Sequence, residues 1–195
     1  SAANRIVGNF IGTDAGGTID RGNANSGVVL DNAPNNLVGG PTAGERNVIS
    51  GNADYGLYIF GASSTNNVAQ GNFIGSDRSG TGNLGNSVYG VLITTSARGN
   101  RIGGSGAGEG NLIANHPNDG VHVASGTNNT IRGNLILNNG GLGIDLAPDG
   151  VTTNDVADTD GGANLLQNFP VLTGATNAAT SATIAGTLNG AANTT

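Results

Sequence analysis

His122 and Asp145 are the two residues of this chain whose types and placement favour acid–base chemistry. They occupy the same position of two similar phrases, Gly-Val-His-Val and Gly-Ile-Asp-Leu. A neutral imidazole beside a carboxylate can serve as a general base near neutral pH. We therefore take His122 and Asp145 as the candidate catalytic pair, with Arg132 as a basic residue that could lie nearby. The alternative is an ordinary surface pair, because the related phrases place no nucleophilic serine or cysteine at this position.

A second candidate site is an acidic stretch near the end of the chain. Asp155, Asp158 and Asp160, followed by Gly161, resemble a calcium loop built from oxygen ligands. Calcium prefers carboxylate and carbonyl oxygens, and a glycine permits the sharp turn. The spacing differs from that of an EF-hand, and the Glu at the twelfth position is missing. We predict a calcium site here, with a solvated acidic turn as the alternative, and the sequence implies no other cofactor.

The composition excludes several classes of protein. Glycine and asparagine together make up one third of the 195 residues, which argues against an α-helical bundle. Charged residues are only 10% of the chain, while valine, leucine and isoleucine recur regularly, unlike in a charged disordered chain. A net charge of −6 argues against nucleic-acid partners, and no apolar run is long enough for a membrane span. The absence of cysteine excludes disulfides and fits an extracellular bacterial protein.

Three short phrases recur along the chain and predict its architecture. The first phrase is glycine, an apolar residue, any residue and an apolar residue, at 27–30, 56–59, 90–93, 120–123 and 143–146. The second is an asparagine-rich phrase, at 35–40, 66–72, 99–104 and 128–134. The third is asparagine, an apolar residue and isoleucine, beginning at Asn9, Asn47, Asn72, Asn111 and Asn134. Three short strands per repeat, varying in length only at the loops, predict a parallel β-helix in which each repeat is one coil.

Alternation along each strand predicts which side chains face the core. In the first phrase the expected inward stack is Val28, Leu57, Val91, Val121 and Ile144, and the outward stack is Val29, Tyr58, Leu92, His122 and Asp145. The asparagine that opens the third phrase is expected to form a hydrogen-bonded ladder between coils. A further polar stack is expected three residues after each isoleucine of that phrase, at Asp14, Asn52, Asp77, His116 and Asn139.

A longer period overlies the coil repeat. The segment 8–14 returns as 71–77, and the segment 38–49 returns as 102–113. This shift of two coils duplicates carboxylates, pairing Asp14 with Asp77 and Glu45 with Glu109. A catalytic group is not normally duplicated at every second coil, so we interpret these residues as parts of the loop architecture.

The recurring phrases, together with the GNFIGTD loop, resemble the right-handed parallel β-helix repeat superfamily, the pectate-lyase-like fold, and in particular its large secreted bacterial repeat proteins. The resemblance covers residues 4–150. It implies an all-β fold, a right-handed parallel β-helix of about five coils with three short strands per coil and an irregular C-terminal β extension. Proteins of this fold include polysaccharide lyases, glycoside hydrolases, adhesins and stalks, so the resemblance leaves the function open.

Three segments are expected. Residues 1–150 form the repeats, residues 151–172 an acidic loop or cap, and residues 173–195 an Ala/Thr-rich extension similar to the first strand of a β-sandwich. The chain opens inside a repeat, so we expect a fragment of a larger surface protein. Uncovered β-helix ends are expected to favour self-association.

Three functions stay open at this point. The first is a non-enzymatic, secreted structural or adhesin-like module, contacting polysaccharide or cell-surface components. The second is a polysaccharide lyase or hydrolase that uses His122 and Asp145. The third is a carbohydrate-binding module with Tyr58 and Tyr89 as stacking platforms for sugar rings.

Overall fold

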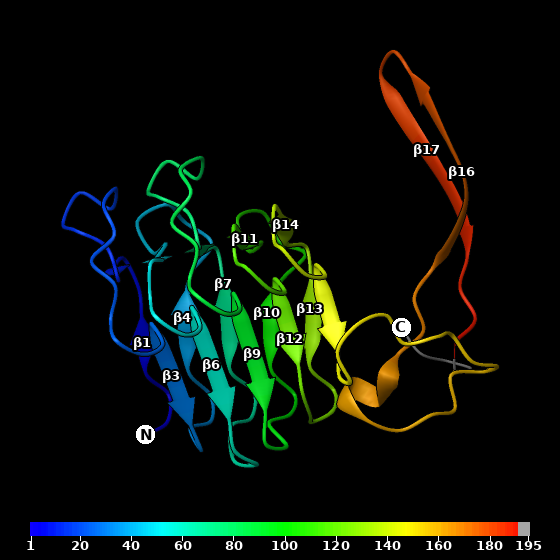
Figure 1. The fold of residues 1–195 in the computed structure, drawn as a ribbon, viewed down its shortest axis with the longest axis horizontal. Helices are drawn as coiled ribbons and strands as arrows, with labels where there is room; N and C mark the ends of the chain where they lie inside the picture. The colour runs from blue at the N-terminus through cyan, green and yellow to red at the C-terminus, as the bar shows by residue number, and fades with distance from the viewer. Residues whose placement is uncertain (191–195) are drawn as a thin grey trace.

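The computed structural model describes residues 1–190, and its regular secondary structure is almost wholly short β-strands, joined by turns and loops. Strands β1 to β15 form three parallel sheets of five strands each, and successive strands along the chain belong to different sheets. Three strands therefore make one coil, and five coils stack into a rod (Figure 1). The predicted all-β parallel β-helix, with about five coils and three short strands per coil, is confirmed.

Each sheet collects one of the three recurring phrases. The first sheet holds the second phrase, in β1 (Arg5–Ile6), β4 (Leu37–Gly39), β7 (Val68–Gln70), β10 (Arg101–Gly103) and β13 (Thr130–Arg132). The second sheet holds the third phrase, in β2 (Phe10–Ile11), β5 (Val48–Ile49), β8 (Phe73–Ile74), β11 (Leu112–Ala114) and β14 (Leu135–Leu137). The third sheet holds the first phrase, in β3 (Val28–Asp31), β6 (Leu57–Phe60), β9 (Val91–Thr94), β12 (Val121–Val123) and β15 (Ile144–Leu146).

The core fills the inside of the coils with aliphatic side chains in register. In the third sheet the predicted inward residues are direct partners, running Val28, Leu57, Val91, Val121 and Ile144. Leu57, Val91 and Val121 are completely buried, as are Ile49, Ile74 and Ile113 of the second sheet, whereas Ile144 in the last coil is 43% exposed. Gly75 shows how closely the coils approach, because its φ is +85° and a Cβ there would collide with the Ala114 carbonyl of the next coil.

Asparagine ladders hold the coils together, as predicted for the third phrase. The backbone N–H and the side-chain Nδ2 of Asn72 both donate to Oδ1 of Asn111, each over 2.9 Å. Asn72 Oδ1 accepts the equivalent pair of hydrogen bonds from Asn47. A second, unpredicted ladder follows the same rule along the first sheet, at Asn4, Asn36, Asn67, Asn100, Asn129 and Asn164.

The further polar stack predicted after the third phrase is partly wrong. Its members Asn52, His116 and Asn139 do form a ladder, but Asn23 and Asn86 take the places expected for Asp14 and Asp77. The reason is that both aspartates lie within long loops, and the chain rejoins the stack only after each loop has closed. These two loops project from the rod and are clear in Figure 1, between β2 and β3 and between β8 and β9.

The C-terminal end of the rod is partly covered by residues that the sequence analysis assigned to an acidic cap. The short segment η1 (Ala163–Leu166) begins a sixth winding, in which Asn164 Oδ1 accepts the N–H of Asn129 over 2.8 Å. Leu166 packs against the core. A cavity of about 590 Å³ remains under this cover, with Ile131, Ile144 and Leu166 among its lining residues. The segment that covers this end therefore continues the asparagine ladder, in addition to containing the acidic loop.

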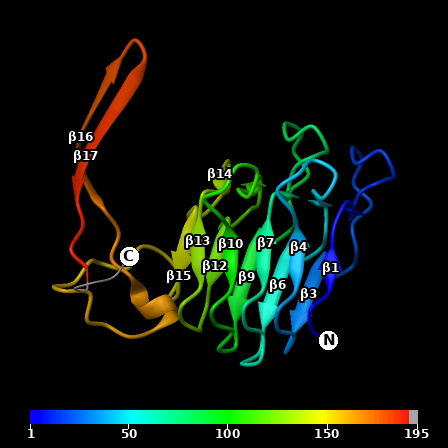
Figure 2. The ribbon, with the colours of Figure 1, turned by 180° about the vertical axis from the view of Figure 1, so that it is seen from behind.

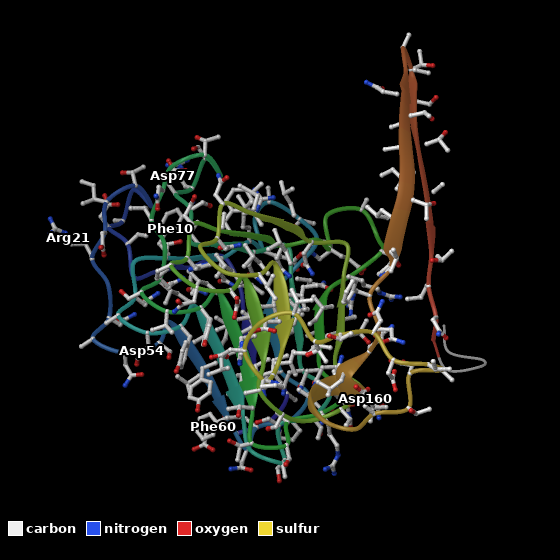
Figure 3. The ribbon with its side chains drawn as sticks, turned by 45° about the vertical axis from the view of Figure 1, so that its right-hand side comes forward. Phe10, Arg21, Asp54, Phe60, Asp77 and Asp160 are labelled. Atoms are coloured by element: carbon white, nitrogen blue, oxygen red, sulfur yellow. The ribbon has the colours of Figure 1, made fainter. Side chains whose placement is uncertain are left out.

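The C-terminal extension forms an antiparallel hairpin of β16 (Val171–Ala178) and β17 (Ser181–Thr187). The extension expected at residues 173–195 thus contains a strand, β17, but this strand pairs with the segment that precedes it in the chain. The hairpin stands away from the rod with exposed side chains on both strands (Figures 2 and 3). The expected extension runs to residue 195, and its last five residues lie outside those that the structure describes. No helix within residues 1–190 is long and apolar enough to cross a membrane.

Candidate functional site

The candidate site lies on the outward face of the third sheet, near its C-terminal end. β12 and β15 pair so that His122 lies directly beside Asp145. His122 Nδ1 is 3.6 Å from Asp145 Oδ2. His122 points outward because the flanking Val121 and Val123 point into the core, and Asp145 shares its side of the sheet because the two residues are paired in register. The structure therefore brings the two predicted site residues together, with an ionisable side chain on each of two adjacent coils.

A third ionisable residue, Asp119, joins this pair and was missed by the sequence analysis. Asp119 Oδ2 is 3.1 Å from His122 Nδ1, closer than the carboxylate of Asp145. Asp119 lies in the turn before Gly120, at the position that Tyr55 and Tyr89 hold in earlier coils. Reading the residue before each first-phrase glycine as one more outward stack would have found it.

Backbone amides fix both carboxylates in place. Asp119 Oδ1 accepts the N–H of Leu142 over 2.7 Å, and Asp145 Oδ2 accepts the N–H of Gly150 over 3.0 Å. The remaining oxygen, Asp145 Oδ1, is buried and has no hydrogen-bond partner among the described residues. A buried carboxylate oxygen without a partner is costly, so this atom calls for a ligand or a proton.

The site is enclosed rather than open. His122 is 5% exposed, Asp119 8% and Asp145 3%. The ring of Tyr89 stacks on the imidazole of His122, with centroids 4.7 Å apart and planes at 9°. At the Nε2 edge of the same imidazole, Asp149 Oδ1 lies 3.8 Å from His122 Nε2. A polymeric substrate cannot reach an imidazole covered in this way unless the turn carrying Asp149 moves.

The aromatic residues beside the site form a cluster of their own. Tyr55 stacks on Tyr89 with centroids 5.8 Å apart, and Tyr58 stacks on Phe60 with centroids 4.6 Å apart. Burial raises the pKa of Tyr55 and of Tyr89. In Figure 3 the labelled Phe60 lies at the edge of the rod away from the long loops. Because these rings turn faces toward one another, they offer less open ring surface than a sugar-stacking platform needs.

The predicted calcium ligands also come together. One oxygen from each of Asp155, Asp158 and Asp160 lies within 4.8 Å of the others. Asp155 Oδ2 accepts from the N–H and hydroxyl of Thr159, and these hydrogen bonds lower the pKa of Asp155. Asp155 Oδ1 and Asp160 Oδ1 have no partner among the described residues. The three side chains are half-buried beside η1, where Figure 3 labels Asp160. Calcium binding here stays a prediction.

Arg132, the third residue considered for catalysis, does not join the candidate pair. It lies in β13 of the first sheet, whereas His122 and Asp145 lie in the third. Its charge instead contributes to lowering the pKa of Glu109. Arg132 therefore belongs to a different face of the rod.

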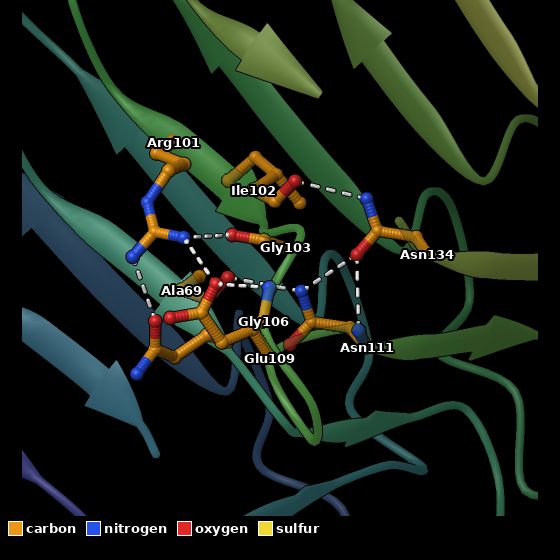
Figure 4. A network of polar contacts seen from close by, with 9 residues as sticks. Ala69, Arg101, Ile102, Gly103, Gly106, Glu109, Asn111 and Asn134 are labelled. Atoms are coloured by element: carbon orange, nitrogen blue, oxygen red, sulfur yellow. Dashed lines mark hydrogen bonds and ion pairs between the residues drawn. The ribbon is translucent and has the colours of Figure 1, made fainter. Parts of the chain in front are cut away.

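The duplicated glutamates each pair with an arginine, Glu109 with one on its own coil and Glu45 with one on the coil before. Glu109 Oε2 accepts the N–H of Gly106 over 3.0 Å and pairs with Arg101 over 3.2 Å, next to the asparagine ladder (Figure 4). Glu45 pairs with Arg5 over 2.9 Å two coils earlier. These contacts lower the pKa of both carboxyl groups, with the hydrogen bond from Thr42 as the largest cause for Glu45 and that from Gly106 for Glu109. Both glutamates therefore hold loops in place.

Comparisons of the chain with family models, curated proteins and solved structures find no match. Function is therefore inferred from the chain's own side chains and their contacts.

Proposed function

We propose that this chain is a non-enzymatic, secreted structural module with an adhesin-like role, part of a larger bacterial surface protein. We further propose that it belongs to the right-handed, pectate-lyase-like superfamily of parallel β-helices. Its task would be to hold a stiff rod outside the cell and to present its loops and terminal hairpin to polysaccharide or other cell-surface components. A stack of coils bonded to their neighbours suits this task, because each coil stabilises the next.

The observation that carries the proposal is that the repeated polar residues form hydrogen bonds within the protein. Each asparagine of the three ladders is bonded to the coil beside it, as Asn36 is to Asn67 over 2.8 and 2.9 Å. The duplicated acids likewise bond to their own loops, as Asp77 Oδ1 does to the N–H groups of Thr81 and Gly82. Groups that are saturated by internal hydrogen bonds hold a scaffold together and are poorly placed to act on a substrate.

A hydrolase or lyase is the second candidate, and one contact favours it. His122 Nδ1 lies 3.1 Å from Asp119 Oδ2, which is the arrangement that orients a general-base histidine. The burial of His122 opposes this function, because a base must reach the proton that it removes. A carbohydrate-binding module based on Tyr58 and Tyr89 is less favoured, since Phe60 and His122 already stack on these rings.

A panel of polysaccharides, assayed for both cleavage and retention, tests the proposal. We expect no cleavage by the chain, together with saturable retention by at least one surface polysaccharide or matrix component. Retention should be unchanged in His122→Ala and Asp145→Asn, because the proposed contacts lie on the loops and the hairpin. Cleavage that disappears in these two variants would refute the structural role and establish the enzyme.

A further inference from the structure

We propose that Asp119, His122 and Asp145 bind one divalent transition-metal ion, with Zn²⁺ as the preferred ion. The ion would join β12, β15 and the turn before β12 at the C-terminal end of the rod. The inference goes beyond the proposed structural role and does not depend on it, since a metal could equally serve an enzyme. It rests on the spacing of three ligand atoms, on an unpartnered oxygen and on the charge of the cluster.

The first support is the spacing of the ligand atoms. One atom from each of the three side chains lies within 4.8 Å of the others. His122 Nδ1 is 3.1 Å from Asp119 Oδ2 and 3.6 Å from Asp145 Oδ2. Zinc bonds to nitrogen and oxygen of about 2.0–2.2 Å place the ligands of a tetrahedral ion about 3.3–3.6 Å apart. The two distances from His122 Nδ1 are therefore close to the separations that a bound zinc ion would impose.

The second support is an oxygen that the protein leaves without a partner. Asp145 is 3% exposed, and its Oδ1 accepts no hydrogen bond from any described residue. The other oxygen of the same carboxylate, Oδ2, faces His122 Nδ1. A metal ion beside His122 could therefore take one or both oxygens of Asp145 and supply the missing partner.

The third support is the charge of the buried cluster. Asp119 and Asp145 together carry up to two negative charges, and a single imidazole can offset at most one. Buried charges persist when they are paired or when they coordinate a metal. A divalent ion bound to neutral His122 would balance both carboxylates.

The surroundings already hold the ligands in position. The N–H groups of Leu142 and Gly150 fix the two carboxylates, and the ring of Tyr89 fixes the plane of the imidazole. Asp149 faces Nε2, the ring nitrogen that the metal would not use. A metal-bound histidine usually donates its other N–H to a carboxylate, which sets its tautomer; Asp149 Oδ1, 3.8 Å away on an exposed side chain, would have to move closer to take this role.

The ligand types select the class of ion. Calcium and magnesium prefer sites made only of oxygen, whereas imidazole is a good ligand for zinc. The cluster offers one nitrogen with carboxylate oxygens and no sulfur. It thus differs from the all-oxygen group of Asp155, Asp158 and Asp160, for which calcium is predicted.

Titration of the metal-free chain with Zn²⁺ by calorimetry, in two buffers of different ionisation enthalpy, tests the proposal. We expect one site per chain, and the difference in heat between the two buffers counts the protons that zinc displaces from its ligands. Asp145→Asn and His122→Gln should each abolish this site, while Asp149→Asn should weaken it on the order of 10-fold as an outer partner. Circular dichroism checks that each variant retains its β structure.

Two control variants separate this site from the other candidates. His116→Asn removes the only other histidine, and Asp155→Asn alters the acidic loop; both should bind Zn²⁺ like the unaltered chain. Co²⁺ in place of Zn²⁺ should give visible absorption bands that are lost in His122→Gln. The proposal is overturned if Zn²⁺ does not bind, if Asp145→Asn binds it unchanged, or if binding is lost in Asp155→Asn instead.

Discussion

The backbone N–H of Asn86 donates to Nδ1 of His116 over 3.1 Å, so a histidine forms one rung of an asparagine ladder. The ladder continues beyond His116, because the backbone N–H of His116 donates to Oδ1 of Asn139 over 3.0 Å. Nδ1 can accept only while it carries no proton. Burial lowers the pKa of His116 to about 4, which keeps the imidazole neutral. This ladder therefore depends on the protonation state of one side chain.

The depressed pKa of His116 predicts that the chain loses stability in mild acid. In the unfolded chain a histidine takes up a proton near pH 6.5, whereas His116 in the folded chain does so near pH 4. Between these values only the unfolded state binds the proton, so the free energy of unfolding falls as the pH falls. The full loss is about 3 kcal/mol and is complete below about pH 4. Denaturant unfolding between pH 7.5 and 5 measures the slope while most carboxylates remain ionised.

The substitution His116→Asn should remove that slope. Asn52, Asn86 and Asn139 already occupy the same ladder, so an asparagine fits the rung and does not titrate. We expect the variant to match the unaltered chain at pH 7.5 and to be more stable than it at pH 5. Equal slopes for the two proteins would show that His116 is not the titrating group.

A leucine at the centre of the third-phrase ladder should destabilise the rod. Asn72→Leu removes hydrogen bonds to Asn47, Asn111 and the carbonyl of Val38, and it leaves buried donors without partners. Each orphaned group costs about 1–3 kcal/mol, so we expect a total above about 3 kcal/mol. Thermal unfolding measures the effect, and Asn9→Leu at the exposed end of the ladder is the control with a smaller loss. An unchanged melting temperature for Asn72→Leu would contradict the structural role of the ladder.

The sixth winding should protect the last coil from exchange with solvent. Asn164→Ala removes the acceptor of the Asn129 N–H and the donor to the Asn129 carbonyl. We expect faster hydrogen exchange in peptides that cover residues 126–134, measured by mass spectrometry. Asn177→Ala in the exposed hairpin is the matched control and should leave this exchange unchanged. Equal protection in Asn164→Ala would mean that η1 does not hold the end.

Calcium should stabilise the acidic loop. Asp155 Oδ1 and Asp160 Oδ1 lack partners, and carboxylate oxygens suit this ion. We expect Ca²⁺ to raise the melting temperature of the unaltered chain and to have no effect on Asp160→Asn. Calorimetry that detects no heat, together with an unchanged melting temperature, would remove this site.

The sequence predicts the fold well because neighbouring coils contact each other through equivalent residues. When the same residue type returns at the same phrase position, as Asn47 and Asn72 do, stacking follows directly from the repeat. The second-phrase ladder was also readable from its recurring asparagines. Asn164 was harder to find, because the long segment after Leu146 hides the return of the phrase.

The candidate site was predictable only in part. The pairing of His122 with Asp145 follows from strand register. The closer approach of Asp119 depends on the path of a turn, and the cover of Asp149 depends on the bend after Leu146. The spacing of the recurring phrases predicts neither the path of this turn nor that of this bend. The burial of the site is seen only in the structure, where His122 is an enclosed residue rather than an exposed catalytic base.

The ladders also give the rod a direction. Along each ladder the asparagine of one coil donates to Oδ1 of the asparagine on the next coil, from Asn9 to Asn47 as from Asn111 to Asn134. The same Nδ2 groups also donate back to backbone carbonyls of the preceding coil, as that of Asn72 does to Val38. The Oδ1 of each asparagine thus accepts from the preceding coil, and its backbone N–H donates to the next coil. Two such stacks joined end to end would continue these asparagine ladders only in a head-to-tail order. Any filament built in this way would be polar, with two chemically different tips.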